Sequence, residues 1–172
     1  MTRAIYPGTF DPVHFGHMDI TRRAAAIFDE LVVAVYDRPL KNLLFTTDER
    51  VALLEKAIAD IPNAWVERYD CLTVDFAAAR NARVIVRGLR VFSDFEFEFR
   101  MALTNQRLAP GIEMASLMTR EEHTFLSSTT VKEVASLNGD ISSMVPPHVS
   151  EALLARFLEP NHPVIPTNQL RD

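Results

Sequence analysis

Residues 3–36 read RAIYPGTFDPVHFGHMDITRRAAAIFDELVVAVY, and this stretch decides the fold. It begins and ends with short apolar runs, residues 3–6 and 31–36, which are typical of buried strands. Between these runs, apolar residues recur at helical spacing, namely Ile20, Ala24, Ile27 and Phe28. A strand, a helix and a second strand in this order predict two parallel strands joined by a crossover helix.

The same alternation continues along the chain. Further strands are predicted at residues 64–69, 84–87 and 113–118, and helices near 74–80 and at 128–136 and 147–158. A capping box at Thr46 and Glu49 opens another helix. Its predicted core stripe is Val51, Leu54, Ile58 and Ile61. A longer helix carries an apolar stripe that we predict to be core rather than a base-stacking platform, namely Phe92, Phe95, Phe99, Ala102 and Leu103.

Five strands alternating with helices predict an α/β fold, a Rossmann-like doubly wound parallel sheet with helices on both faces. Right-handed crossovers favour the strand order 3-2-1-4-5, which reverses between the first and fourth strands. Ligands bind such sheets at the carboxyl ends of the strands beside the reversal. The loops after Tyr6 and after Arg87 are therefore the predicted site.

Length and composition limit the classes of protein. The 172 residues are 48% hydrophobic and 24% charged, as in an ordinary globular domain. We expect one domain over residues 1–159 and an extended Pro-rich tail over residues 160–172. A net charge of −5 argues against a general nucleic-acid binder, and no apolar run approaches the ~18 residues of a membrane span. The single Cys71 excludes an intramolecular disulfide and a Cys-clustered zinc site, and we expect a cytoplasmic protein.

The two nominated loops hold three of the five glycines, Gly8, Gly16 and Gly88, which let a backbone approach a ligand closely. His14 and His17 lie three residues apart at the mouth of the first helix, where free N–H groups and the helix dipole favour a phosphate. The pair by itself could equally be structural or part of a metal site. Because no third ligand lies nearby, we predict no protein-held metal.

Several motifs together resemble one family. Residues 8–12 (GTFDP) and 14–17 (HFGH) resemble the nucleotidylyltransferase superfamily, whose hallmark is an H/T-x-G-H tetrad after a G-T-F-D turn. Residues 6–7 (YP), 85–90 (IVRGLR), 94–98 (DFEFE) and 125–133 (FLSSTTVKE) narrow the resemblance to bacterial phosphopantetheine adenylyltransferases, over roughly residues 3–158. The resemblance implies adenylyl transfer from ATP to 4′-phosphopantetheine, which yields dephospho-coenzyme A and pyrophosphate in coenzyme A biosynthesis.

Such a reaction needs no general base, because a phosphate oxygen is already anionic at pH 7. Attack on the α-phosphorus is direct and in line, so catalysis consists of positioning and electrostatic stabilisation. The resemblance implies Mg²⁺ held mainly by the ATP phosphates, and a homohexamer with coenzyme A as a possible inhibitor.

The resemblance also implies a role for each matching residue. The catalytic residues would be Thr9, His17, Lys41 and Arg90. ATP would contact Thr9, Phe10, His14, His17, Gly88, Leu89, Arg90, Glu98 at the adenosine end, His123, Thr124, Phe125, Leu126, Ser127, Ser128 and Thr129. Phosphopantetheine would contact Thr9, Lys41, Thr73 and Arg87. Independently of the family, Arg87 ends a buried strand, so a ligand or an internal carboxylate must pair with it.

Three positions depart from the common family pattern: His14 where Thr is frequent, Thr73 where Leu or Met is common, and His123 where an aromatic is frequent. Alternatives stay open at this point. Another acceptor such as nicotinate mononucleotide, or cytidylyl transfer, would keep the chemistry. A nucleotide-binding regulatory module would keep only the fold, although it would not need an α-phosphoryl clamp.

Overall fold

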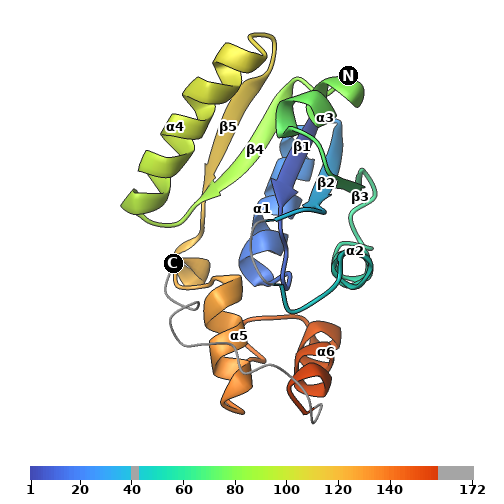
Figure 1. The fold of residues 1–172 in the computed structure, drawn as a ribbon, viewed down its shortest axis with the longest axis vertical. Helices are drawn as coiled ribbons and strands as arrows, with labels where there is room; N and C mark the ends of the chain where they lie inside the picture. The colour runs from blue at the N-terminus through green and yellow to red at the C-terminus, as the bar shows by residue number, and fades with distance from the viewer. Residues whose placement is uncertain (40–42, 159–172) are drawn as a thin grey trace.

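Five parallel strands form one sheet in the order β3-β2-β1-β4-β5, which confirms the predicted topology (Figure 1). The structure is a computed structural model, and it describes residues 1–39 and 43–158. The strands are β1 (Arg3–Gly8), β2 (Glu30–Tyr36), β3 (Ala64–Tyr69), β4 (Val84–Leu89) and β5 (Glu113–Met118). Lys41 and the predicted tail at 160–172 lie outside the described residues.

The helices lie where the apolar periodicity predicts them. They are α1 (Phe15–Ile27), α2 (Thr47–Ala57), α3 (Thr73–Ala79), α4 (Phe92–Leu108), α5 (Ser128–Ser136) and α6 (Pro147–Leu158), with the short 3₁₀ turn η1 (Glu121–His123). The capping box is confirmed, since the Thr46 hydroxyl accepts from the Glu49 amide and the Glu49 carboxylate accepts from the Thr46 amide. No described helix is both long and apolar enough to cross a membrane.

Alternate residues of the central strands supply two separate cores. In β1, Ala4 and Tyr6 pack on one face of the sheet, while Ile5 packs on the other. The first core also contains residues of α1, α2, α5 and α6, and the second contains residues of α3. Both faces of the central strands are therefore buried, as a parallel sheet requires.

One predicted core stripe is wrong for the single chain. Phe92, Phe95 and Phe99 of α4 are 86%, 49% and 51% exposed, and Leu103 is 52% exposed. Helical spacing identifies residues that share a face, but it does not say what covers that face. In Figure 1, α4 flanks the edge strand β5, away from the central strands.

A smaller correction concerns the stripe of α1. Ile20 and Ala24 are buried as predicted, but Ile27 is 61% exposed. The helix ends at Ile27, and the next residue, Phe28, packs against the core instead.

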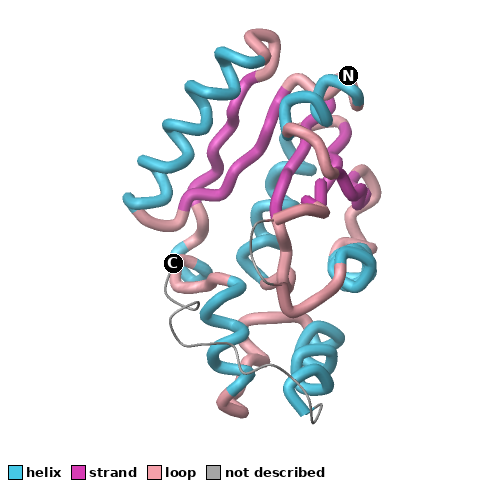
Figure 2. Tube along the Cα trace, viewed as in Figure 1, coloured by secondary structure: helices cyan, strands magenta, loops and turns pink. Residues whose placement is uncertain are grey.

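Helices α5 and α6 lie beyond the carboxyl ends of the central strands (Figure 1). The loops that leave β1 and β4 run toward this end of the sheet, as Figure 2 shows in pink. The reversal of strand order between β1 and β4 therefore faces a layer built by the last third of the chain.

Candidate active site

The first helix begins with two histidines that cap it reciprocally. His14 is the N-cap of α1, and its Nδ1 accepts from the His17 amide at 3.4 Å. In return, Nδ1 of His17 accepts from the His14 amide at 3.3 Å. The two rings stack with their centroids 3.7 Å apart. The prediction that both histidines stand at the mouth of the first helix is confirmed.

These hydrogen bonds define what the two rings can do. Because each Nδ1 is an acceptor, the proton of each neutral ring resides on Nε2. Burial, followed by the positive charges of Arg90 and Arg87, lowers the pKa of His17 from 6.5 to about 3. Burial and the neighbouring His17 hold the pKa of His14 well below its usual range. At pH 7 both rings are therefore neutral donors at the start of a helix.

Glycine is needed on both sides of the loop that joins β1 to α1, at the end of β1 and in the first turn of α1. A Cβ on Gly8 would lie 2.9 Å from the ring of Phe10, and a Cβ on Gly16 would lie 3.0 Å from the ring of His14. Phe10 itself takes a left-handed backbone conformation with φ 51° and is 2% exposed. Its ring meets His17 edge-on, with centroids 4.9 Å apart. The glycines thus make room for the rings that hold His17.

Two arginines at the end of β4, Arg87 and Arg90, place positive charge near His17. Arg90 donates from Nη1 to the Leu126 carbonyl at 2.9 Å and pairs with Asp94 at 3.1 Å. Arg87 pairs with Glu98 at 2.6 Å and donates to the Pro7 carbonyl at 2.8 Å. The prediction that Arg87 must find a partner is confirmed, and that partner is an internal carboxylate.

Glu98 is the partner of Arg87 in this structure, and its contact with the adenosine end stays a prediction. The family resemblance gives it to the adenosine end, whereas both of its oxygens here accept from the Arg87 guanidinium. The Glu98 residue is 8% exposed.

Residues 119–128, between β5 and the first residue of α5, lie next to the start of α1. Ser127 caps α5 by accepting from the Thr130 amide at 3.0 Å, and the Ser128 hydroxyl donates to the Pro12 carbonyl at 2.8 Å. His123 approaches Gly16, where an added Cβ would lie 3.7 Å from the His123 Cβ. Of the residues predicted to contact ATP, the structure brings Phe10, His14 and His17 together and joins Arg90 to Leu126.

Residues 9–12 are braced by three side chains that our sequence analysis did not select. Asp11 is 3% exposed, and its carboxylate accepts from the Leu44 and Phe45 amides and from Lys132 of α5 at 2.8 Å. Arg50 of α2, 1% exposed, donates to the Thr9 carbonyl at 2.7 Å. Asp11 and Lys132 both stand inside the quoted motifs, so the motifs themselves were an available signal.

Thr73 lies apart from the histidines, at the first turn of α3 beyond β3. Its hydroxyl is 3.0 Å from the hydroxyl of Tyr69, whose ring stacks on Phe76 with centroids 4.8 Å apart. Burial raises the pKa of Tyr69, while the hydrogen bond with Thr73 and the nearby positive charge of Arg87 oppose this rise. Thr73 and Tyr69 therefore lie at the carboxyl edge of the sheet, on the side of β3.

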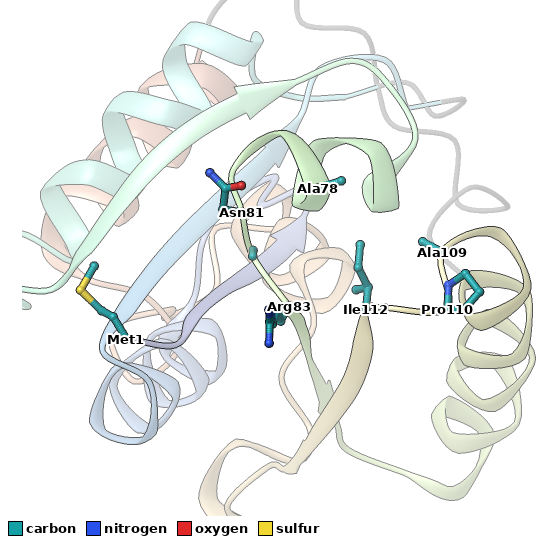
Figure 3. Close-up of a pocket in the computed structure, with 9 residues that line it drawn as sticks. Met1, Ala78, Asn81, Arg83, Ala109, Pro110 and Ile112 are labelled. Atoms are coloured by element: carbon teal, nitrogen blue, oxygen red, sulfur yellow. The ribbon is translucent and has the colours of Figure 1, made fainter.

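Two other kinds of site can be compared with this one. Within residues 1–39 and 43–158, no three His, Cys, Asp or Glu side chains are grouped so that they could hold a metal ion. A hollow of about 670 Å³ lies at the opposite, amino end of the strands, between Met1, Asn81, Arg83 and Ile112 (Figure 3). It contains none of the predicted site residues. The group of histidine and arginine side chains at the carboxyl edge is therefore the candidate active site.

The arrangement of fold and site is that of a nucleotidyltransferase. Residues 5–134 match the family model described as Cytidylyltransferase-like. A Vibrio parahaemolyticus structure, provisionally named a nicotinate-nucleotide adenylyltransferase, aligns with a TM-score of 0.68 at 22% identity. The alignment covers 92% of this chain and 97% of that one, and it supports the fold.

Closer relatives share one name. Phosphopantetheine adenylyltransferase of Aquifex aeolicus is 52% identical over 90% of this chain and 96% of its own length. Those of Heliobacterium modesticaldum and Synechococcus elongatus are 53% and 48% identical, over 92% and 97% of this chain and 92% and 98% of their own. The chain belongs to the phosphopantetheine adenylyltransferase family.

Proposed function

We propose that this protein transfers the adenylyl group of ATP to 4′-phosphopantetheine and releases pyrophosphate, a step of coenzyme A biosynthesis. The observation that carries the proposal is that the neutral His17 ring at the N-terminus of α1 lies near enough to Arg87 and Arg90 for their positive charges to lower its pKa. Two cationic side chains and a ring donor at the positive end of a helix dipole suit two polyanions that must approach each other. The names of the relatives supply the acceptor.

In the proposed reaction, an oxygen of the phosphopantetheine phosphate attacks the α-phosphorus of ATP. One P–O bond forms, the bond from the α-phosphorus to the bridging oxygen breaks, and pyrophosphate leaves with its electron pair. No side chain has to remove a proton, because the attacking oxygen is already anionic. The residues therefore act by alignment and by stabilising the charge that moves onto the α-phosphoryl oxygens.

His17 is the proposed transition-state donor. Its Nε2–H is the free polar group of the ring, because Nδ1 is held by the His14 amide. The depressed pKa keeps the ring in one protonation state throughout the neutral range. Thr9 would orient the attacking phosphate, and Lys41, which lies outside the described residues, would bridge the two phosphate groups.

Each of the two arginines is proposed to bind a different substrate. Arg87 would bind the phosphopantetheine phosphate, and Arg90 would bind the β- and γ-phosphates together with the start of α5, Ser127, Ser128 and Thr129. Nucleotide contacts are proposed for Phe10, His14, Gly88, Leu89, His123, Thr124, Phe125 and Leu126. The pantetheine arm would reach Thr73, whose hydroxyl already meets Tyr69.

Mg²⁺ is proposed to arrive on the ATP phosphates. Asp11, the acidic residue of the motif, has both oxygens occupied by Leu44, Phe45 and Lys132, which supports this assignment. When bound, Mg²⁺ supplies charge neutralisation on the phosphate oxygens.

Pyrophosphate release in the presence of ATP and Mg²⁺ tests the function directly, with 4′-phosphopantetheine and nicotinate mononucleotide as competing acceptors. We expect release with phosphopantetheine alone. If pyrophosphate is released with nicotinate mononucleotide alone, the reaction is still adenylyl transfer, but the proposed acceptor is wrong. If protein that binds ATP releases no pyrophosphate with either acceptor, the protein is a nucleotide-binding module and not an adenylyltransferase.

We further propose a cytoplasmic homohexamer that coenzyme A can inhibit. The exposed aromatic face of α4 supports self-association, because contiguous apolar surface of this kind marks protein–protein contacts.

A further inference from the structure

Asp19 lies on α1, two residues after His17, and its carboxylate pairs with two arginines at once. Its Oδ2 accepts from Nη1 of Arg23 at 3.0 Å, and its Oδ1 lies 3.2 Å from Nε of Arg120. The Asp19 side chain is 8% exposed, whereas those of Arg23 and Arg120 are 31% and 59% exposed. A carboxylate that is so little exposed needs cationic partners, and the two arginines supply them.

Both arginines connect α1 to the end of β5. Nη1 of Arg23 also donates to the carbonyl of Met118, the last residue of β5, at 2.7 Å. Arg120 follows two residues later in the chain, so Asp19 is connected to the backbone on both sides of Thr119. These contacts hold the turn after β5 against a helix that lies far away in sequence.

The same turn packs against the end of β4. The Thr119 amide donates to the Leu89 carbonyl at 2.7 Å. A Cβ added to Gly88 would lie 3.2 Å from Cγ1 of Ile20 on α1 and 3.9 Å from the Thr119 hydroxyl oxygen. Helix α1, the end of β4 and the turn after β5 therefore meet in close contact, so the position of the turn affects the surroundings of Gly88 and Leu89.

The chain that leaves this turn carries residues that are proposed to contact the nucleotide. The 3₁₀ turn η1 follows at once, and the His123 amide donates to the Arg120 carbonyl at 2.9 Å. Residues 123–126 come next. Because the phosphates of ATP are assigned to Arg90 and the start of α5, residues 123–126 would face the nucleoside.

We propose that Asp19 is a positioning residue: through Arg23 and Arg120 it fixes the turn after β5, and thereby the side of the site that receives the nucleoside of ATP. The identity of this ligand rests on the proposed function.

Charge alone predicts a different result. Loss of the Asp19 carboxylate raises the positive potential around an anionic ligand, which favours binding, whereas loss of the Arg23 guanidinium lowers that potential. Positioning predicts weaker ATP binding from either loss, because either one releases the turn after β5. Two variants that change the charge in opposite directions therefore distinguish the two effects.

Asp19→Asn and Arg23→Met are these variants. We expect each to raise KM for ATP about threefold or more, as lost hydrogen bonds between charged groups should do, with kcat and KM for phosphopantetheine within about twofold of wild type. Asp60→Asn and Arg22→Met are the matched controls, since Arg22 precedes Arg23 on α1 and pairs with the exposed Asp60. Neither control should change KM for ATP by more than about twofold.

Calorimetric titration with ATP and with inorganic triphosphate separates the nucleoside side of the site from the phosphate side. Asp19→Asn and Arg23→Met should bind ATP about threefold more weakly or worse, and triphosphate within about twofold of wild type. Should Asp19→Asn not fold, Asp19→Ala replaces it, since alanine suits a helix interior and removes the same charge.

An unchanged or lower KM for ATP in Asp19→Asn would overturn the proposal, as would an equal loss of affinity for ATP and triphosphate. A fall in kcat alone would show that Asp19 is merely structural. If the wild type binds ATP without turnover, the proposed function fails separately and the titrations still decide the role of Asp19. A wild type that binds no ATP would refute both proposals.

Discussion

His17 combines three properties: a fixed tautomer, a neutral ring and a place at a helix N-terminus. We expect His17→Ala to lower kcat about 100-fold or more, equal to about 2.7 kcal/mol of transition-state stabilisation. ATP binding should weaken less, because the donor acts mainly on charge that develops during transfer. Steady-state kinetics and calorimetric ATP titration measure the two effects.

His17→Gln is the matched control, since it returns an amide donor to the same turn. It should recover part of the lost kcat. Near-normal turnover in His17→Ala would refute the role of His17.

The depressed pKa of His17 also has a consequence for stability. The unfolded chain takes up a proton near pH 6.5, while the folded ring stays neutral until about pH 3. The unfolded state therefore binds more protons than the folded state in this window. The contribution of the neutral His17 ring to the free energy of unfolding is complete above pH 6.5 and decreases as the pH drops. Urea unfolding between pH 7 and pH 4 should show a smaller decline in His17→Gln than in wild type. Equal slopes would contradict the assigned neutrality.

At the scale of elements, Asp11 joins three parts of the chain that lie far apart in sequence. Its carboxylate ties the loop after β1 to residues 44–45 and to Lys132 on α5. Asp11→Asn should lower the free energy of unfolding by about 3 kcal/mol, because it leaves a buried ammonium without its counter-charge. Urea titration measures this loss.

The control is an exposed pair of the same kind. Arg22 and Asp60 lie 3.0 Å apart with side chains 46% and 65% exposed, so Asp60→Asn should lower the free energy of unfolding much less than Asp11→Asn does. Similar losses in the two variants would show that burial of the Asp11 pair has no special effect.

The sequence predicts the strands and helices, but it predicts only some of the side-chain contacts between them. Alternating periodicity predicted every strand and helix near its observed position, because the patterns of buried strands and amphipathic helices are local. Arg87 was predictable as a residue in need of a partner, but the choice of Glu98 depends on how α4 packs against β4. Asp11 meets Lys132 across 121 residues, a distance over which periodicity carries no information.

At the scale of the whole molecule, the face of α4 is the feature that a single chain does not satisfy. Phe95 and Phe99 stack on each other, with centroids 5.8 Å apart, and Phe92 and Leu103 extend the same exposed stripe. An aromatic stripe of this length is costly in water, and a second copy of the chain could cover it. The stripe that was wrongly predicted as core is therefore expected to become buried on assembly.

Sedimentation of the wild type should give a mass several times the 19.4 kDa of one chain, six times for the proposed hexamer. Phe95→Ser combined with Phe99→Ser should shift the mass toward that of one chain, because two central apolar contacts are lost from each copy. Leu137→Ser is the matched control, since Leu137 is 77% exposed but lies beyond α5. Its mass should equal that of the wild type. A wild type that sediments as one chain would refute assembly through α4, and the stripe would then need a different partner.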